Sequence, residues 1–199
     1  MRTRTWIRFV LLASLPVFLG CKDDDKEITP TPKEPENPIT TFLEESDDLA
    51  EGTRTSGPWE LGVLFTASVP GKITQVGSKM PEPGSYRVII WDYDTEEILR
   101  QKTVEQTAPG ILKLYDIEPL LIEDNKKYII SINTRDSGVN KPYYYAVKTG
   151  GGDFVPFTRG SILVHEACYT STSAAEMPAA VTDVTYELYG FPEFTFIPD

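Results

Sequence analysis

The stretch E60-L-G-V-L-F-T-A-S-V-P-G-K-I-T-Q-V-G-S78 decides the fold class. Leu61, Val63 and Phe65 alternate with other residues, as they do on a strand with one buried face. Pro70-Gly71 then interrupts the run, and a second stretch rich in β-branched residues follows. Two short strands joined by a turn are therefore predicted at 60–67 and 72–78.

The same pattern continues to the end of the chain. Turn-forming residues separate further strand-like runs, which are predicted at 85–92, 97–104, 111–117, 127–134, 143–149, 161–169, 183–190 and 194–197. Roughly eight to ten short strands at this spacing are typical of a sandwich or jelly roll. We expect an all-β fold, a single jelly-roll-like β-sandwich over 58–199, preceded by a signal peptide and a disordered tether.

Three quoted motifs carry a resemblance to a known family. They are E60-L-G-V-L-F-T66, V88-I-I-W-D-Y-D-T-E-E-I-L99 and K127-Y-I-I-S-I-N-T134. In this order they resemble the bacterial domain of unknown function DUF4082, most firmly between residues 60 and 134. The resemblance implies a jelly-roll sandwich of the kind attached to extracellular or carbohydrate-related proteins, and it implies no particular binding residues.

Residues 1–20 have the form of a secretory signal peptide. Three arginines precede a short apolar run from Phe9 to Leu19, which is too short to span a membrane as a helix. The following F18-L19-G20-C21 resembles the lipobox of bacterial lipoproteins, in which the cysteine is acylated by fatty acids such as palmitate. Cys21 is therefore predicted to anchor the protein in a lipid bilayer.

The residues after Cys21 indicate a localisation signal followed by a tether. Lys22, Asp23, Asp24 and Asp25 resemble the acidic export signal of Bacteroidetes lipoproteins, which implies the outer face of the outer membrane. A charge run in any solvated tether is the alternative. Residues 21–57, acidic and rich in proline, are predicted to form the tether, and its part 41–50 allows a helical turn or docking on the domain.

Composition excludes some functions. Without residues 1–20 the chain has 16 basic and 30 acidic residues, a net charge of −14, so nucleic-acid binding is not expected. With Cys21 acylated, Cys168 has no intramolecular partner for a disulfide and is predicted to be a small buried hydrophobe.

Two polar groupings have residue types that can carry chemistry. His165 and Cys168 are three residues apart on one predicted strand, so they should point to opposite faces and not form a catalytic pair. Asp92, Asp94 and Glu96 could bind calcium through their oxygens or serve in glycoside hydrolysis. Their place between two strands favours a hairpin turn, so no cofactor or metal is expected.

Aromatic residues are the best candidates for a binding site. Trp59, Tyr143 and Tyr145 could stack on sugar rings, although inward-facing aromatics could equally fill the core. Polar residues in loops that could add hydrogen bonds are Asp136, Asn140 and Asp153.

These observations favour a non-catalytic, surface-anchored protein that binds an extracellular ligand, with glycan as the favoured class. The alternative is a structural or adhesion subunit that recognises another envelope protein, for example through an exposed strand edge. An enzyme such as a glycosidase is the least favoured hypothesis, because the sequence has one histidine and no nucleophile motif.

Overall fold

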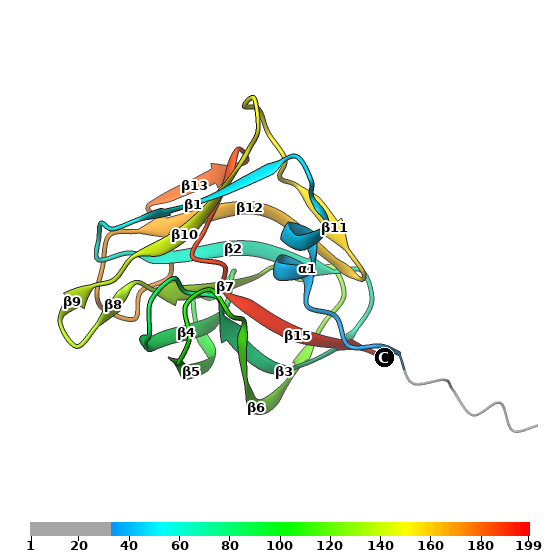
Figure 1. Cartoon of the computed structure of the whole chain (residues 1–199). Coiled ribbons are helices and arrows are strands. Elements are labelled where there is room, and N and C mark those ends of the chain that lie inside the picture. The colour runs from blue at the N-terminus through cyan, green and yellow to red at the C-terminus, as the bar shows by residue number, and fades with distance from the viewer. Residues whose placement is uncertain (1–32) are drawn as a thin grey trace, which may run out of the picture. The chain divides into compact units, whose positions relative to one another are not determined.

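The structure, a computed structural model, describes residues 33–199. Its largest sheet is antiparallel and has seven strands (Figure 1). In spatial order these are β11 (Phe157–Arg159), β12 (Ile162–Thr170), β2 (Glu60–Ala67), β7 (Tyr128–Asn133), β4 (Gly84–Asp92) and β5 (Ile98–Gln106), with β13 (Val181–Val184) also paired to β12.

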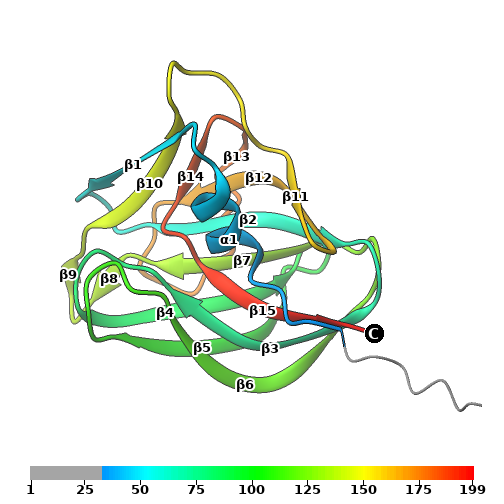
Figure 2. The same ribbon diagram turned by 45° about the vertical axis from the view of Figure 1, so that its right-hand side comes forward.

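Two three-stranded sheets form the opposing layer. The first has the order β15 (Glu193–Pro198), β3 (Gly71–Ser78) and β6 (Lys113–Ile122). The second has the order β1 (Leu49–Arg54), β10 (Tyr143–Lys148) and β14 (Glu187–Tyr189). A short hairpin of β8 (Arg135–Asp136) and β9 (Val139–Asn140) precedes β10, and the helix α1 (Pro38–Glu45) precedes β1 (Figure 2).

The core lies between the large sheet and the two smaller ones. Phe65 of β2 stacks on Phe194 of β15, with ring centroids 4.6 Å apart. Tyr169 of β12 meets Tyr189 of β14 edge to face at 5.6 Å. One face of the seven-stranded sheet therefore packs against both smaller sheets, and the predicted all-β sandwich is confirmed. The chain crosses between layers from β2 to β3, β3 to β4, β5 to β6 and β6 to β7, as in jelly rolls.

The expected domain boundary at residue 58 differs from the structure. The folded unit begins at Lys33 and includes α1 and β1, which sequence analysis assigned to the tether 21–57. Ile39 and Leu43 of α1 are buried in the main core, and β1 pairs with β10 over its whole length. The prolines and charges around these two elements are typical of a tether, so the sequence pattern did not predict that α1 and β1 pack on the sandwich. The predicted signal peptide, Cys21 and the acidic run after it lie outside the described residues.

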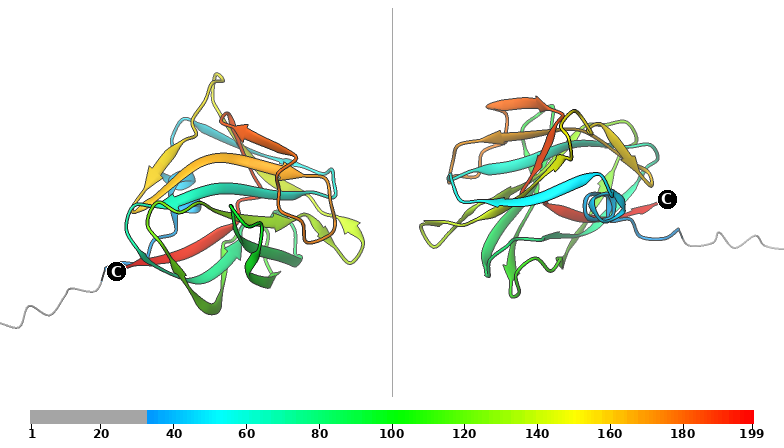
Figure 3. Two further views of the ribbon diagram at one scale, coloured as in Figure 1. Left: turned by 180° about the vertical axis from the view of Figure 1, so that it is seen from behind. Right: turned by 45° about the horizontal axis from the view of Figure 1, so that its top comes forward.

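The outer face of the large sheet is also covered, in part, by the chain itself. A second apolar cluster lies there and contains Leu64, Ile89, Trp91, Ile129 and Cys168. The segment 171–180, between β12 and β13, crosses this face (Figure 3, left), and its Met177 packs against the cluster.

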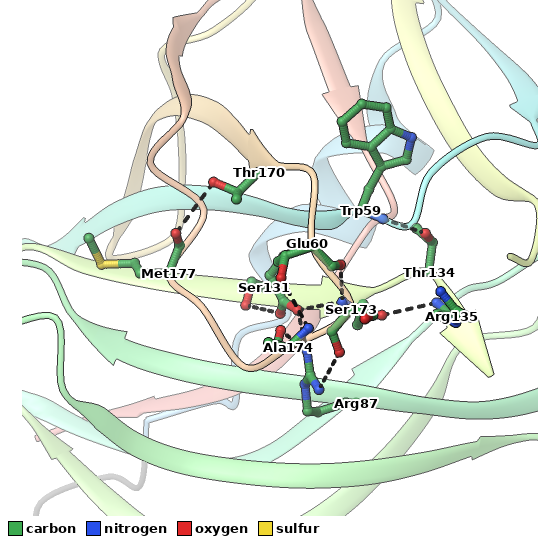
Figure 4. A network of polar contacts seen from close by, with 12 residues as sticks. Trp59, Glu60, Arg87, Ser131, Thr134, Arg135, Thr170, Ser173, Ala174 and Met177 are labelled. Carbon is green, nitrogen blue, oxygen red and sulfur yellow. Dashed lines mark hydrogen bonds and ion pairs between the residues drawn. The ribbon is translucent and has the colours of Figure 1, made fainter. Parts of the chain in front are cut away.

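Buried polar contacts fix this crossing segment to the sheet (Figure 4). Glu60 has no exposed surface, and its carboxylate accepts hydrogen bonds from Ser131 at 2.6 Å and from Asn133 and Arg87 at 2.8 Å. Arg87 and Asn133 also donate to backbone carbonyls of segment 171–180. The network holds Glu60, and with it the start of β2, in one position.

The two ends of the described chain lie side by side. Lys33 Nζ donates to the carbonyl of Asp199, and the Asp199 N–H donates to Pro70 O at 3.0 Å, just beyond the end of β2 (Figure 1). Within residues 33–199 we find no helix with the length and apolar character needed to cross a bilayer.

Candidate functional site

An aromatic pocket of about 230 Å³ lies where the sheet of β1, β10 and β14 meets the ends of β2 and β12. Its lining comes from segments far apart in the sequence: Arg54, Ser56, Trp59, Leu61, Tyr143, Tyr169 and Tyr189. We use the name aromatic pocket for this cavity and these seven residues. It contains four aromatic rings and one charged side chain, which is Arg54.

The rings in the aromatic pocket are held in edge-to-face contacts. Trp59 and Tyr169 have centroids 5.6 Å apart and planes at 81°, and Tyr169 meets Tyr189 with the same spacing and angle. This arrangement is favoured by the ring quadrupoles. Because Trp59, Tyr169 and Tyr189 support one another, this part of the pocket wall is preorganised.

Hydroxyl and indole groups give the pocket a polar edge. Trp59 Nε1 donates to Ser56 Oγ at 2.9 Å, and Ser56 Oγ lies 3.2 Å from the Tyr143 hydroxyl. Tyr143 is buried, with 5% of its surface exposed, whereas Trp59 is half-buried. The three side chains join apolar ring surface to hydrogen-bonding groups, which is the combination that a shallow ligand site needs.

Arg54 is fixed at the rim of the pocket by two contacts. Its guanidinium lies over the Tyr145 ring at 4.0 Å, and its Nη1 is 2.8 Å from Glu187 Oε1. Tyr189 donates its hydroxyl to the other oxygen of Glu187 at 3.0 Å. Burial and the neighbouring Glu187 raise the pKa of Tyr189, so this hydroxyl stays protonated at neutral pH.

Strand register explains how Arg54 reaches this place. Gly52 pairs with Tyr145 across β1 and β10, and a Cβ atom on Gly52 would lie 2.6 Å from the Tyr145 ring. The absence of a side chain there lets the Tyr145 ring lie across β1. The ring then forms the platform under Arg54, two residues further along.

Trp59 is positioned by the chain around it. Its N–H donates to Thr134 Oγ1 at 3.0 Å, and the Thr134 N–H donates back to Trp59 O at 2.9 Å (Figure 4). Asn140 Nδ2 donates to Gly57 O at 2.7 Å, which ties the segment before β2 to the hairpin of β8 and β9.

The structure brings some of the predicted ligand-binding residues together and separates others. Trp59 and Tyr143 both line the aromatic pocket, and Tyr145 supports Arg54 beside it. Asn140 acts through the loop before Trp59 and does not line the pocket.

The two predicted loop aspartates are placed elsewhere. The Asp136 side chain accepts from Ser137 Oγ in the β8–β9 hairpin. Asp153 accepts a hydrogen bond of 2.6 Å from Thr185, and neither aspartate lines the aromatic pocket.

Sequence reasoning missed the other residues of the pocket. The sequence pattern places Arg54 and Ser56 in the predicted tether, and Tyr169 and Tyr189 in predicted strands. A signal was present for the two tyrosines, since both stand at the ends of predicted strands, but no pattern indicated that these strand ends meet.

Asp92, Asp94 and Glu96 form the turn between β4 and β5. Asp92 Oδ1 accepts from the N–H groups of Asp94 and Thr95, and its Oδ2 is 2.8 Å from Lys126 Nζ. The hydrogen bond from Lys126 lowers the pKa of Asp92. Both oxygens are thus occupied in the way expected of a hairpin turn. Within residues 33–199 no three His, Cys, Asp or Glu side chains are grouped to hold a metal ion.

A larger, open hollow lies beside this turn. It measures about 370 Å³, and Asp94, Glu96 and Glu166 line it together with Tyr93 and residues of segment 171–180. Burial raises the pKa of Glu166, which also interacts with Asp183. Compared with the aromatic pocket it has one ring instead of four, so it offers little surface for stacking.

The expectation that His165 and Cys168 point to opposite faces is wrong. A β-bulge interrupts the pairing of β12 with β2 between Val164 and Glu166 and changes the alternation of side chains. His165 Nε2 lies 3.0 Å from Thr66 Oγ1, and Cys168 belongs to the apolar cluster on the same outer face.

Cys168 and His165 nevertheless have separate surroundings. Cys168 is fully buried, as predicted, and this burial raises the pKa of its thiol, which keeps it protonated. Burial also lowers the pKa of His165. A protonated, inaccessible thiol is a poor nucleophile, so the geometry favours structural roles.

Comparison with known proteins adds no assignment: no protein-family model matches the chain, and no curated protein matches its sequence. The resemblance of residues 60–134 to the DUF4082 domain therefore stays a prediction.

Proposed function

We propose that this protein is a lipoprotein of the cell surface whose β-sandwich binds a glycan in the aromatic pocket, without catalysis. One observation carries the proposal, namely that four aromatic rings and several hydrogen-bonding groups from distant segments converge on one cavity. The anchor at Cys21 and the outer-membrane location rest on the sequence alone.

The chemistry of the pocket matches that of a sugar. A sugar ring has apolar C–H faces, which pack on aromatic rings, and hydroxyls around its edge, which exchange hydrogen bonds. The volume of about 230 Å³ is below the roughly 300–1,000 Å³ of sites for drug-sized ligands. A single sugar residue, free or at a chain end, suits this space better than a long stretch of polysaccharide.

The position of the pocket supports a role at the surface. Trp59 precedes β2 at one end, whereas Lys33, where the folded unit begins, lies beside Pro70 at the other end. Eight strand residues separate the two ends, which is about 26 Å. A chain anchored upstream of Lys33 would therefore attach at the end away from the pocket.

The lining of the pocket supports binding without turnover. Glycoside hydrolysis generally uses two carboxyl groups on either side of the bond that is cut. Among the described residues that line the pocket there is no Asp or Glu, and Glu187 behind it is engaged by Arg54 and Tyr189.

Tryptophan fluorescence provides the test. Trp59 and Trp91 are the tryptophans of the folded unit, and Trp91 is buried in the cluster on the outer face. In a Trp91→Phe protein without residues 1–20, which contain Trp6, Trp59 becomes the sole reporter, and titration with mono- and oligosaccharides should change its emission in a saturable way. A glycan array with the unaltered protein identifies the sugars to titrate.

A matched pair of variants ties the signal to the pocket. Tyr169→Ala should abolish binding, whereas Tyr186→Ala, which removes an exposed aromatic outside the pocket, should leave it unchanged. The absence of binding to any host, plant or microbial glycan on the array would contradict the proposal. Release of reducing sugar would overturn its non-catalytic part.

The alternative, a subunit that recognises another protein, has one observation in its favour. β1 is the last strand of its sheet and pairs only with β10, so its other edge is open to a partner strand. Because β1 has six residues, such a partner strand could pair over six residues at most. That edge is short and carries the exposed charges of Glu51 and Arg54, features that protect edges from pairing. Capture of an envelope protein, lost on replacing Thr53 by proline, would favour this alternative.

A further inference from the structure

Arg54 is the one charged residue among those that line the aromatic pocket. Resting on the proposed function, we infer that the sugar bound there is acidic: a uronic acid or related sugar whose carboxylate pairs with the Arg54 guanidinium while its ring packs on the aromatic wall. A neutral sugar would make the same ring contacts and lack this ion pair.

The guanidinium retains donors for a ligand. It has five N–H groups in a planar fork, and a bidentate carboxylate engages two of them. The contact with Glu187 is ionic and not a directed hydrogen bond, because Glu187 Oε1 has no hydrogen-bond partner within residues 33–199. The side chain of Arg54 is 44% exposed, whereas that of Glu187 is 6% exposed. A ligand in the pocket therefore meets the cation and not the anion.

Arg54 is also held ready to bind. Its contact with the Tyr145 ring at 4.0 Å and its ion pair at 2.8 Å hold the guanidinium in place before a ligand arrives. Preorganisation reduces the entropy lost on binding. A planar fork that is already oriented suits the two oxygens of a carboxylate.

The remaining polar groups of the pocket do not compete with an anionic ligand for Arg54. The indole N–H of Trp59 and the hydroxyl of Tyr189 are already used in hydrogen bonds to Ser56 and Glu187. None of the described lining residues carries a carboxylate, so a carboxylate of the ligand meets no like charge in the lining. This match is local, since the whole chain is acidic and would repel anions at long range.

Calorimetric titration of the full chain, solubilised in detergent, tests the inference with four probes: galacturonate, its methyl ester, galactose and acetate. We expect galacturonate to bind about tenfold more tightly than galactose or the ester, because a charge-assisted hydrogen bond is stronger than a neutral one. Acetate should bind weakly, since it has no ring to stack. Glucuronate and glucose repeat the comparison for the other common ring stereochemistry.

Variants locate the effect. Arg54→Gln should remove the preference, so that galacturonate and galactose bind with about equal affinity. Arg54→Lys should keep part of the preference, since lysine has the positive charge but not the planar pair of N–H donors. Arg159→Gln is the matched control, because Arg159 forms a surface ion pair with Glu45 away from the aromatic pocket. Removing Arg54 alone leaves the buried Glu187 carboxylate without its cation, which could destabilise the protein. The double variant Arg54→Gln/Glu187→Gln removes both charges and tests the same loss of preference without that buried charge.

The outcomes separate this inference from the proposed function. If galactose binds as tightly as galacturonate, or if Arg54→Gln keeps the preference, the inference is overturned and glycan binding stands. If no sugar binds under any condition, both fail. If acetate binds as tightly as galacturonate, the site recognises carboxylates in general and the acidic-sugar assignment is wrong.

Discussion

Glu193 is a carboxyl group without exposed surface at the first turn of α1. It accepts hydrogen bonds from the Thr40 N–H and hydroxyl, both at 2.6 Å, and from the Phe194 N–H at 2.9 Å. These donors favour the ionised form, whereas burial disfavours it more strongly and raises the pKa of Glu193 to about 7. The protonation state of Glu193 therefore changes with pH at the point where α1 is bonded to β15.

The first prediction concerns the pH dependence of stability. Because the pKa of Glu193 is higher in the folded state than its ordinary value of 4.5, its contribution is fully present below pH 4.5 and is lost as pH rises through about 7. Over this window the free energy of unfolding should fall by about 3 kcal/mol from this group. Urea denaturation at a series of pH values should show a flatter curve for Glu193→Gln.

The difference between the two curves is the measurement, since other buried acids such as Glu60 contribute equally to both proteins. Glutamine also costs some stability at every pH, because its amide N–H groups face the N–H donors of the helix. Parallel curves for the two proteins would show that Glu193 does not titrate in this range.

At the same scale, the sequence allowed part of the pocket to be predicted. Trp59 and Tyr143 are large aromatics beside turns, and such residues at strand ends can line a cavity at the end of the sandwich. Periodicity gives the face on which a side chain lies but not the strand that faces it across the sandwich. For this reason Tyr169 and Tyr189 were missed, and Asp136 and Asp153 were chosen from loops that do not reach the pocket.

At the scale of elements, α1 and β1 extend the sandwich. α1 buries Ile39 and Leu43, and β1 completes the sheet that carries Arg54 to the aromatic pocket. A proline-rich, acidic segment is usually a tether. Here two short elements within it are held by tertiary contacts that local sequence does not encode.

The second prediction follows from those contacts. Compared with a chain of residues 33–199, a chain of residues 58–199 should unfold at a temperature at least about 10 °C lower, or fail to fold cooperatively. Burying Ile39 and Leu43 contributes roughly 1.5–3 kcal/mol each, and a kcal/mol shifts the midpoint by a few degrees in a domain of this size. Circular dichroism on heating measures the difference.

The truncated chain also loses Arg54 and Ser56 from the lining of the aromatic pocket, so it should lose sugar binding even where it still folds. Equal midpoints for the two chains would show that residues 33–57 add nothing to the fold.

The other elements show where sequence patterns succeed. Each of the ten predicted strands overlaps observed strands, because alternation and turn residues are local signals. The predicted strand at 183–190 is two strands, β13 and β14, which lie in different layers. The strands β8, β9 and β11 are two or three residues long and too short to show a period. The bulge in β12 was also beyond prediction, since only its pairing with β2 reveals it.

On the scale of the whole molecule, the proposed anchor and the proposed binding site have opposite requirements. With the net charge of −14 that the chain has without residues 1–20, anionic headgroups would repel the protein, so the proposed membrane attachment would have to come from lipid. The aromatic pocket and Lys33 lie at opposite ends of β2, so attachment at one end leaves the other end accessible.

The last prediction tests this attachment. Cells producing the full chain and fed a labelled fatty acid should incorporate the label through Cys21, and the protein should partition into the detergent phase. Cys21→Ser should abolish both, because each buried methylene contributes about 0.8 kcal/mol and no other lipid site is expected. Cys168→Ser is the matched control, since it removes the only other cysteine, which is buried, and should leave labelling unchanged. Surface protease treatment of intact cells then reports the membrane face: digestion of the labelled protein is expected if the acidic run after Cys21 directs export, and protection would place the protein on the inner side.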